Sequence, residues 1–175
     1  RLYSRAFRNW FGKNAKTKRI PDFILLNNNK EIYESFLKGY LEGDGNWKIQ
    51  EGRARVNANT VSEILALQLQ LLSIRMNDFF NITKVDFSKY PSNYNGRIIK
   101  GGIGFLLRTS AGPISSLMGL KKAPRHNKSY KFFDNYVAVP IKSIKRIRYC
   151  GKVLNIQTRE GNYLASNIAV KNCKS

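Results

Sequence analysis

An aspartate at the predicted end of a helix is the side chain best placed for chemistry in this sequence. Asp44 lies between Gly43 and Gly45, directly after a stretch whose apolar residues recur at helical spacing. These residues are Ile32, Phe36, Leu37, Tyr40 and Leu41. Because the C-terminal end of a helix carries partial negative charge, a carboxylate there favours a nearby cation. A divalent metal ion is the strongest candidate, so the sequence predicts that Asp44 binds one.

Two glycines lie within the same predicted helix. Gly39 and Gly43 are four residues apart, which places them on one helical face. Each costs roughly 1 kcal/mol relative to alanine inside a helix, so a packing role is the expected compensation. We therefore expect another backbone to approach closely at this face.

The stretch Leu37-x-Gly39-x-x-Glu42-Gly43-Asp44-Gly45 resembles the LAGLIDADG motif of homing endonucleases. In that family two such helices pack through their small residues, and each delivers one acidic side chain to a metal-dependent DNA-cleavage site. The resemblance implies that Asp44 is catalytic and binds the metal, with the Gly43 carbonyl as an extra ligand. Glu42 stands where the motif usually has its first Asp. The alternative is a short amphipathic helix that ends in a Gly-Asp-Gly turn.

The charge of the whole chain indicates a polyanionic partner. Lys and Arg number 31 against 11 Asp and Glu, which gives a net charge of +20. Nucleic acid is the usual partner of such a chain, and double-stranded DNA is the one that the resemblance implies. The basic residues are interleaved with Tyr, Phe and Trp over the whole chain, unlike those of a disordered basic tail.

The few imidazole and sulfur groups limit the kinds of metal site. His126 is the single histidine, which excludes a site with several histidines. Cys150 and Cys173 are too few for a disulfide scaffold or a cysteine zinc site. Oxygen ligands, and hence Mg²⁺ or a similar hard ion, are what the chain offers. The sequence shows no run of 18 apolar residues and no secretory signal, so we expect an intracellular, cytoplasmic protein without a membrane partner.

The elements around the first motif predict an α+β fold. A helix from Lys30 to Gly43 is followed by a hairpin that turns at Glu51-Gly52, and a capping box at Thr60-Val61-Ser62-Glu63 begins a second helix. The remaining elements are strands over 79–90 and 97–109, a break at Gly101-Gly102 and a helix over 113–119. This order matches the αββαββα half-saddle that the resemblance implies, whose four strands lie in DNA.

The predicted hairpin carries side chains suited to base edges and phosphates in a major groove. Lys48 and Gln50 point outward, with Arg53, Arg55 and Asn57 opposite them. For any one of these, a solvated strand face is the competing interpretation. A dense basic run later in the chain has two open interpretations, phosphate contact and a solvated loop. Its residues include Lys121, Lys122 and Arg125.

Two further segments are interpreted through the resemblance. In the family a lysine on the strand before the last helix often lies near the cleavage centre, and Lys100 opens the corresponding strand here. It would orient water or stabilise charge on the phosphate. The segment from Lys18 to Phe23, which includes Ile20-Pro21, is similar to one that precedes the second LAGLIDADG motif of inteins. Before it, residues 1–18 are basic and aromatic with helical spacing.

The C-terminal residues resemble the last splicing blocks of inteins. Strands are expected over 136–139, 141–148 and 152–158. The resemblance implies that the Asn172 amide cyclises onto its own carbonyl and that the Cys173 thiol accepts an acyl group. Lys171 stands in place of the expected penultimate histidine and would donate a hydrogen bond to that carbonyl. Asn155 and Gly161 also depart from the expected Asp and His, and a plain terminal hairpin is the alternative.

The sequence predicts three regions and a missing counterpart. Residues 1–134 would form a LAGLIDADG half-domain with a basic N-terminal segment, 135–172 the last strands of an intein splicing (Hint) domain, and 173–175 the start of the following host segment. One acidic helix is found where an endonuclease needs two, and Arg1 stands where splicing needs Cys or Ser. The expected partner is an N-terminal intein fragment with the first LAGLIDADG motif, or a second copy in a homodimer.

Three functions thus remain in competition. The first is a C-terminal intein fragment that combines site-specific double-strand DNA cleavage with protein splicing through Asn cyclisation. The second is a sequence-specific DNA- or RNA-binding LAGLIDADG module, such as a maturase, without cleavage. The third is splicing with an inactive endonuclease.

Overall fold

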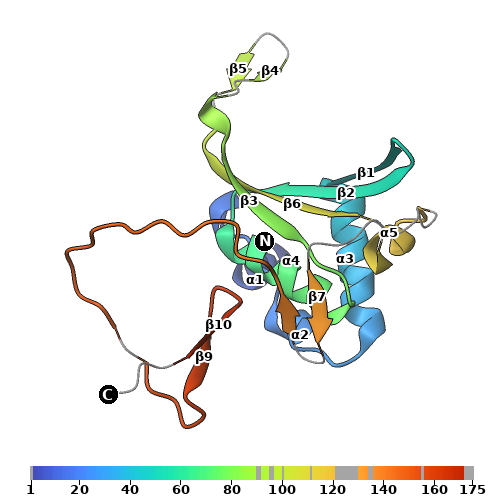
Figure 1. Cartoon of the computed structure of the whole chain (residues 1–175). Coiled ribbons are helices and arrows are strands. Elements are labelled where there is room, and N and C mark those ends of the chain that lie inside the picture. The colour runs from blue at the N-terminus through green and yellow to red at the C-terminus, as the bar shows by residue number, and fades with distance from the viewer. Residues whose placement is uncertain are drawn as a thin grey trace. The chain divides into compact units, whose positions relative to one another are not determined.

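The computed structural model describes residues 2–89, 92–94, 97–99, 101–110, 112–120, 130–133, 136–154 and 156–171. The chain divides into two compact units, Arg1–Lys128 and Ser129–Ser175. The first combines helices with antiparallel strands and the second contains antiparallel hairpins, so the predicted α+β class is confirmed (Figure 1). The assignment of these units to an endonuclease half and a splicing domain stays a prediction. None of the described helices combines the length and apolar character that crossing a membrane requires.

The first unit contains five α-helices and six strands among its described residues. The helices are α1 (Leu2–Phe11), α2 (Asp22–Leu25), α3 (Lys30–Asp44), α4 (Glu63–Arg75) and α5 (Pro113–Leu117). The strands are β1 (Gly45–Gln50), β2 (Arg53–Thr60), β3 (Asn81–Asp86), β4 (Ser92–Tyr94), β5 (Arg97–Ile99) and β6 (Ile103–Ser110). Two short 3-10 helices are η1 (Ala15–Thr17) and η2 (Phe87–Lys89).

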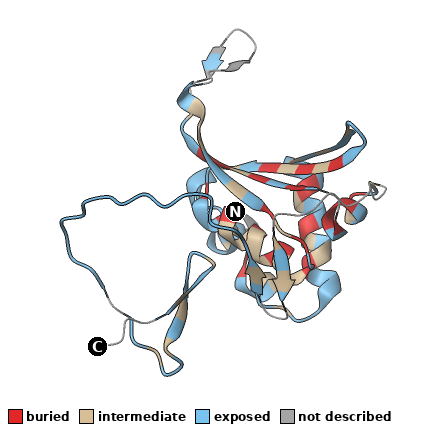
Figure 2. Ribbon diagram, in the orientation of Figure 1, coloured by how far each residue is buried: buried red, intermediate tan, exposed pale blue. Residues whose placement is uncertain are grey.

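One four-stranded antiparallel sheet organises this unit. Its strand order is β1-β2-β6-β3, so β2 and β6 are central. Figure 1 shows α3 and α4 on one side of the sheet, and the hydrophobic core lies between these helices and the sheet. Buried and exposed residues alternate along β2 and β6 (Figure 2), as expected for strands with one face on the core. The core includes Leu37, Leu41, Val56, Ala58, Leu65, Leu69, Leu72, Phe105, Leu107 and Ile114.

Helix α3 begins and ends close to the predicted residues. The Asn29 side chain accepts a hydrogen bond from a first-turn N–H and caps the helix. At the other end, the Gly45 N–H donates to the Leu41 carbonyl, and β1 follows without a loop. A Cβ atom on Gly45 would lie 2.4 Å from that same carbonyl oxygen, so only glycine fits the junction. Asp44 is therefore held at a sharp transition from helix to strand.

The strand predicted over 79–90 is shorter than expected, and the break predicted at Gly101-Gly102 in the second strand is confirmed. Phe87 begins the 3-10 turn after β3, and its N–H donates to the Gly102 carbonyl at 3.0 Å. A Cβ atom on Gly101 would come within 2.6 Å of the Phe87 Cβ, and one on Gly104 within 2.7 Å of the Phe87 ring. The glycines thus make room for Phe87, which separates the β4–β5 hairpin from the main sheet.

Among its described residues, the second unit contains two hairpins and a stretch without regular secondary structure between them. β7 (Lys131–Phe133) pairs with β8 (Tyr136–Ala138), and β9 (Asn162–Ala165) pairs with β10 (Ile168–Lys171). The strands predicted over 141–148 and 152–158 are wrong, because the described residues of those ranges form no strand. Ile147 is 83% exposed and Leu154 is 87% exposed. A strand must pair its backbone with a neighbour, and no described residue provides one here.

A buried carboxylate joins α5 to the end of α4. Asp78 is fully buried, and its Oδ1 accepts hydrogen bonds from the Thr109 hydroxyl at 2.8 Å and the Phe79 N–H at 2.8 Å. Its Oδ2 accepts from the Ile114 N–H at 3.1 Å, in the first turn of α5. The space beside the carboxylate admits only Gly112, whose Cβ would lie 2.4 Å from Oδ2. Asp78 therefore stabilises the fold and does not belong to a surface site.

Replacing Asp78 by alanine should destabilise the first unit strongly. The Thr109 hydroxyl and the Ile114 N–H would remain buried without their acceptor. Each buried donor left without a hydrogen bond lowers the stability of the fold by about 1–3 kcal/mol. We expect the free energy of unfolding, measured by urea denaturation, to fall by at least ~2 kcal/mol. Glu42→Ala on the exposed face of α3 is the control and should change it by less than ~0.5 kcal/mol. An equally small change for Asp78→Ala would contradict this structural role.

Candidate functional site

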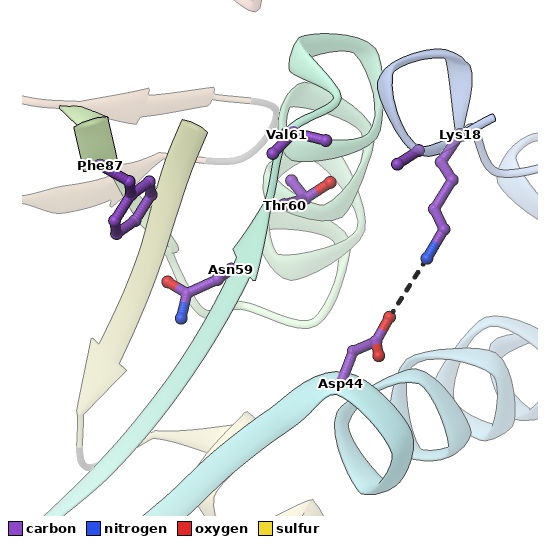
Figure 3. Close-up of a pocket in the computed structure, with 7 residues that line it drawn as sticks. Lys18, Asp44, Asn59, Thr60, Val61 and Phe87 are labelled. Carbon is purple, nitrogen blue, oxygen red and sulfur yellow. Dashed lines mark ion pairs between the residues drawn. The ribbon is translucent and has the colours of Figure 1, made fainter. Parts of the chain in front are cut away.

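The Asp44 carboxylate is exposed and faces a lysine from an earlier part of the chain. Its Oδ2 lies 3.5 Å from the Lys18 Nζ (Figure 3), and about half of each side chain is exposed to solvent. The Lys18 ammonium thus supplies a cation at this helix end, and the divalent metal ion expected at Asp44 stays a prediction. An exposed ion pair of this kind contributes at most about 1 kcal/mol to stability. The pair with Lys18 therefore does not prevent the carboxylate from binding a metal ion.

Side chains of α4 and of its N-cap residue position Lys18 by holding the backbone of the segment that contains it. The Ser62 hydroxyl caps α4 by accepting from the Leu65 N–H at 3.3 Å, and donates to the Lys18 carbonyl at 2.6 Å. Two residues later, the Ile20 N–H donates to Gln68 Oε1 at 2.7 Å and the Ile20 carbonyl accepts from Gln68 Nε2 at 3.3 Å. Ile20 itself is fully buried. The ammonium therefore extends from a fixed anchor toward Asp44.

A pocket of about 280 Å³ opens beside this ion pair. In Figure 3 the end of β2, with Asn59 and Thr60, lies across from Asp44 and Lys18. Phe87 contributes an apolar wall. The pocket thus brings together a carboxylate, an ammonium and an amide from three separate elements. This combination suits a phosphate group or a hydrated cation.

Asp44 is the one carboxylate, among the described residues that line the pocket, that could bind the expected metal. Among the described residues, no group of three His, Cys, Asp or Glu side chains is close enough to hold an ion. Mg²⁺ commonly takes one or two carboxylates and completes its shell with phosphates and water. Asp44 therefore fits a metal site that is shared with a substrate or a second acidic residue. The Gly43 carbonyl as an extra ligand stays a prediction.

A groove of about 650 Å³ also includes Lys18 and Asp44 in its lining, together with other residues of α3 and of the segment 11–19. Tyr40 lines it, and its hydroxyl is buried without a hydrogen-bond partner in the described part of the chain. Burial, and then the charge of Asp44, raise the pKa of Tyr40 to about 12. Tyr40 therefore lines the groove while its hydroxyl, itself buried, has no hydrogen-bond partner among the described residues.

The glycine face of α3 is open. Both Gly39 and Gly43 are exposed, and a Cβ atom built on either would meet nothing within 4 Å. No described residue thus requires these glycines. The predicted helix packing at Gly39 and Gly43 has space to occur, and its partner stays a prediction.

The five hairpin residues predicted to meet DNA lie on one face of the sheet. In the register of β1 and β2, Lys48 is directly opposite Arg55, and Gln50 is opposite Arg53. Directly paired residues share a face, and Asn57 lies two residues from Arg55 on the same strand. The core is on the other face, where Ala54, Val56 and Ala58 are buried.

The same face continues onto β6 and β3 with residues that the sequence did not single out. Arg108 is exposed and pairs with Asn57 on one side and Asn81 on the other. Asn46 pairs with Asn57 across the β1–β2 ladder. The signal available in the sequence was the alternation along 103–110, which puts Arg108 on the opposite face of the strand from Leu107. Glu51 approaches this face from the turn, with its carboxylate 3.7 Å from the Arg55 guanidinium.

Several predicted site residues lie outside the described residues. These are Lys100, Lys121, Lys122, Arg125, Asn172 and Cys173. Lys171 is the last residue of β10, where it is exposed and pairs with Asn162 of β9. The roles predicted for these seven side chains stay predictions.

Comparison with known proteins gives two partial similarities. No family model matches the sequence. The chain is 30% identical over 176 residues to the ATP-dependent DNA helicase Hel308 of Thermococcus kodakarensis, with 90% of this chain aligned to 14% of the helicase. It is 28% identical over 188 residues to the uncharacterized protein MJ0043 of Methanocaldococcus jannaschii, with 99% of this chain aligned to 22% of that protein. The chain therefore spans less than a quarter of either relative.

The ionisation of Tyr40 should report on the charge of Asp44. Because that charge contributes to the raised pKa, Asp44→Asn should lower the pKa below about 12, while burial keeps it above the usual value. An unfolded tyrosine ionises near pH 10, so the unfolded chain loses a proton that the folded chain keeps. The free energy of unfolding should therefore fall as the pH rises from about 10 to about 12.

The measurement is the phenolate absorbance during a pH titration, with Tyr40→Phe subtracted to isolate this residue. Glu42→Gln, which removes a charge from the same helix two residues earlier, is the control and should leave the titration unchanged. An unchanged Tyr40 titration in Asp44→Asn would show that the two groups do not interact.

Proposed function

We propose that this chain is one half of a metal-dependent DNA endonuclease of the LAGLIDADG type, carried within an intein. The observation that carries the proposal is an exposed carboxylate, Asp44, at the end of a helix whose glycine face is open and whose carboxylate has an ammonium 3.5 Å away. A second acidic helix, from an N-terminal partner or from another copy of the chain, would complete the site.

The order of the elements supports the fold assignment. Without the β4–β5 hairpin, α3 is followed by β1, β2, α4, β3, β6 and α5, which is the αββαββα order of the family. The sheet is antiparallel, and its polar face carries the basic and amide side chains of the hairpin. A half-saddle of this kind would lie with that face in the major groove of double-stranded DNA.

The side chains of the pocket have complementary tasks in phosphodiester hydrolysis. Asp44 would hold Mg²⁺, which when bound lowers the pKa of a water molecule and makes it a nucleophile. The Lys18 ammonium would stabilise the negative charge that develops on the phosphate. Ser62 holds the Lys18 carbonyl and Gln68 holds the backbone of Ile20, two residues later, so little reorganisation is needed when the phosphate arrives.

The second unit supports the splicing half of the proposal. The β9–β10 hairpin ends at Lys171, immediately before the Asn172-Cys173 pair. In the proposed step the Asn172 side-chain nitrogen attacks its own backbone carbonyl, which forms an imide and breaks the peptide bond to Cys173. The exposed apolar side chains of 141–156 suit a domain whose remaining strands come from a partner fragment.

The alternative is a nucleic-acid-binding module without cleavage. It is favoured by one observation, that Asp44, which pairs with the Lys18 ammonium, is the single carboxylate among the described residues that line the pocket. The similarity to part of a DNA helicase agrees with binding DNA under either function.

Cleavage of selected DNA tests the nuclease proposal. Duplexes that the full chain binds are isolated from a randomised pool and incubated with Mg²⁺, with and without the upstream fragment. Asp44→Asn should keep the affinity for DNA and lower Mg²⁺-dependent nicking by at least ~100-fold. Glu42→Gln is the matched control and should nick at the wild-type rate. Wild-type binding without nicking would favour the binding module, and nicking by Asp44→Asn at full rate would exclude Asp44 as the metal ligand.

The polar face of the sheet is tested separately from cleavage. Replacing Arg55 and Arg108 together by glutamine should weaken DNA binding and lower the salt dependence of log K by about 2, since each phosphate contact contributes roughly 0.9. Lys84→Gln is the control, because Lys84 pairs with Phe105 and belongs to the opposite face. If Lys84→Gln weakened DNA binding as much as each of the two arginine replacements does, the effect would be one of net charge and not of the polar face.

A further inference from the structure

Four aromatic side chains form a cluster on α1 and α2, and one of them, Phe11, also lines the groove of about 650 Å³. The Phe7 and Phe11 rings stack with centroids 5.7 Å apart, and the Trp10 ring meets Phe23 edge-on at 5.6 Å. Phe7, Trp10 and Phe23 are 55%, 48% and 57% exposed. Phenylalanine and tryptophan bury most of their area when a fold supplies a core. This cluster, which we term the aromatic surface, therefore leaves about half of the Phe7, Trp10 and Phe23 surface exposed and accessible to a ligand.

The aromatic surface is held in place rather than carried on a loose end. The Arg19 guanidinium donates to the Asn9 carbonyl at 2.6 Å and to the Trp10 carbonyl at 3.3 Å. The Arg19 N–H donates to the Phe11 carbonyl at 3.0 Å. These bonds satisfy the end of α1. Gly12 permits the close approach, since it has φ +97° and its Cβ would lie 2.0 Å from a backbone oxygen. A ligand would meet rings that are already ordered, which reduces the entropic cost of binding.

The charge on α1, which carries three of the four rings, has a single sign. The first acidic residue of the sequence is Asp22, and the residues before it include seven basic ones: Arg1, Arg5, Arg8, Lys13, Lys16, Lys18 and Arg19. Arg5 and Arg8 are exposed on α1 itself, between the aromatic residues. A surface of exposed rings and positive charge without any carboxylate on α1 is complementary to a polyanion that carries flat apolar groups.

We propose that the aromatic surface binds single-stranded nucleic acid, with unpaired bases stacked on Trp10, Phe7 and Phe23 and with Arg5 and Arg8 at the phosphates. A duplex hides the faces of its bases, whereas a single strand exposes them, and stacking on aromatic rings is the usual source of affinity for single strands. This activity is independent of the nuclease proposal, because it uses neither Asp44 nor the polar face of the sheet.

Fluorescence of Trp10 tests the proposal directly. The chain has two tryptophans, so Trp47→Phe in the full chain leaves Trp10 as the sole reporter. An oligodeoxythymidine of about 20 nucleotides, which forms no secondary structure, should quench that fluorescence on binding. In anisotropy measurements with the labelled oligonucleotide, Trp10→Ala and Phe23→Ala should each weaken binding about tenfold. Arg5→Gln with Arg8→Gln should lower the salt dependence of log K by about 1.4.

Matched controls separate this surface from any exposed ring. Phe133→Ala removes an aromatic of the second unit with nearly the same exposure, 47%, and should leave the affinity for the oligonucleotide unchanged. Circular dichroism establishes that each variant is folded. The proposal is overturned if the oligonucleotide leaves Trp10 unquenched, or if Trp10→Ala and Phe23→Ala bind it as the wild type does. It is equally overturned if the chain self-associates and this association shields Trp10 from quenching by acrylamide. It is also overturned if anionic vesicles change the Trp10 fluorescence and the oligonucleotide does not.

Discussion

The attachment of one extended segment to α4 determines the candidate site. Ser62 and Gln68 hold the backbone of Lys18 and Ile20 through three hydrogen bonds, and the fully buried Ile20 side chain adds apolar contact. Without that attachment, Lys18 would be one surface lysine among many. With it, an ammonium is held beside the carboxylate at the end of α3, and the pocket acquires groups of both signs. An electrostatic site is most effective when its charges are positioned before the ligand arrives.

The sheet serves two purposes because its strands have a period of two. One face of β2 and β6 supplies the core with small and apolar side chains, and the other presents arginine and amide groups to solvent. The same register that buries Val56 and Leu107 therefore places Arg55, Asn57 and Arg108 together. Core packing and a nucleic-acid surface are thus specified by one set of strand pairings, and a slip of one residue would exchange the two faces.

Several features of the chain are satisfied only in part by its described residues. The glycines of α3 have open space above them, the Tyr40 hydroxyl is buried without a partner, and Ile147 and Leu154 are almost fully exposed. Each of these costs free energy in a chain by itself, through lost helix propensity, an unmade hydrogen bond or exposed apolar area. These are the features that the partner proposed above would have to satisfy.

The sequence by itself determined the α+β class, the helix that ends at Asp44 and the hairpin that carries Lys48 and Arg55, because these follow from local periodicity, capping and turn residues. Only the tertiary structure placed Lys18 beside Asp44 and Arg108 beside Asn57. Those neighbours lie 26 and 51 positions apart, and no local pattern encodes such a distance. The strands predicted over 141–158 failed for the related reason that alternation gives a strand its faces, whereas only a paired neighbour completes its backbone hydrogen bonds.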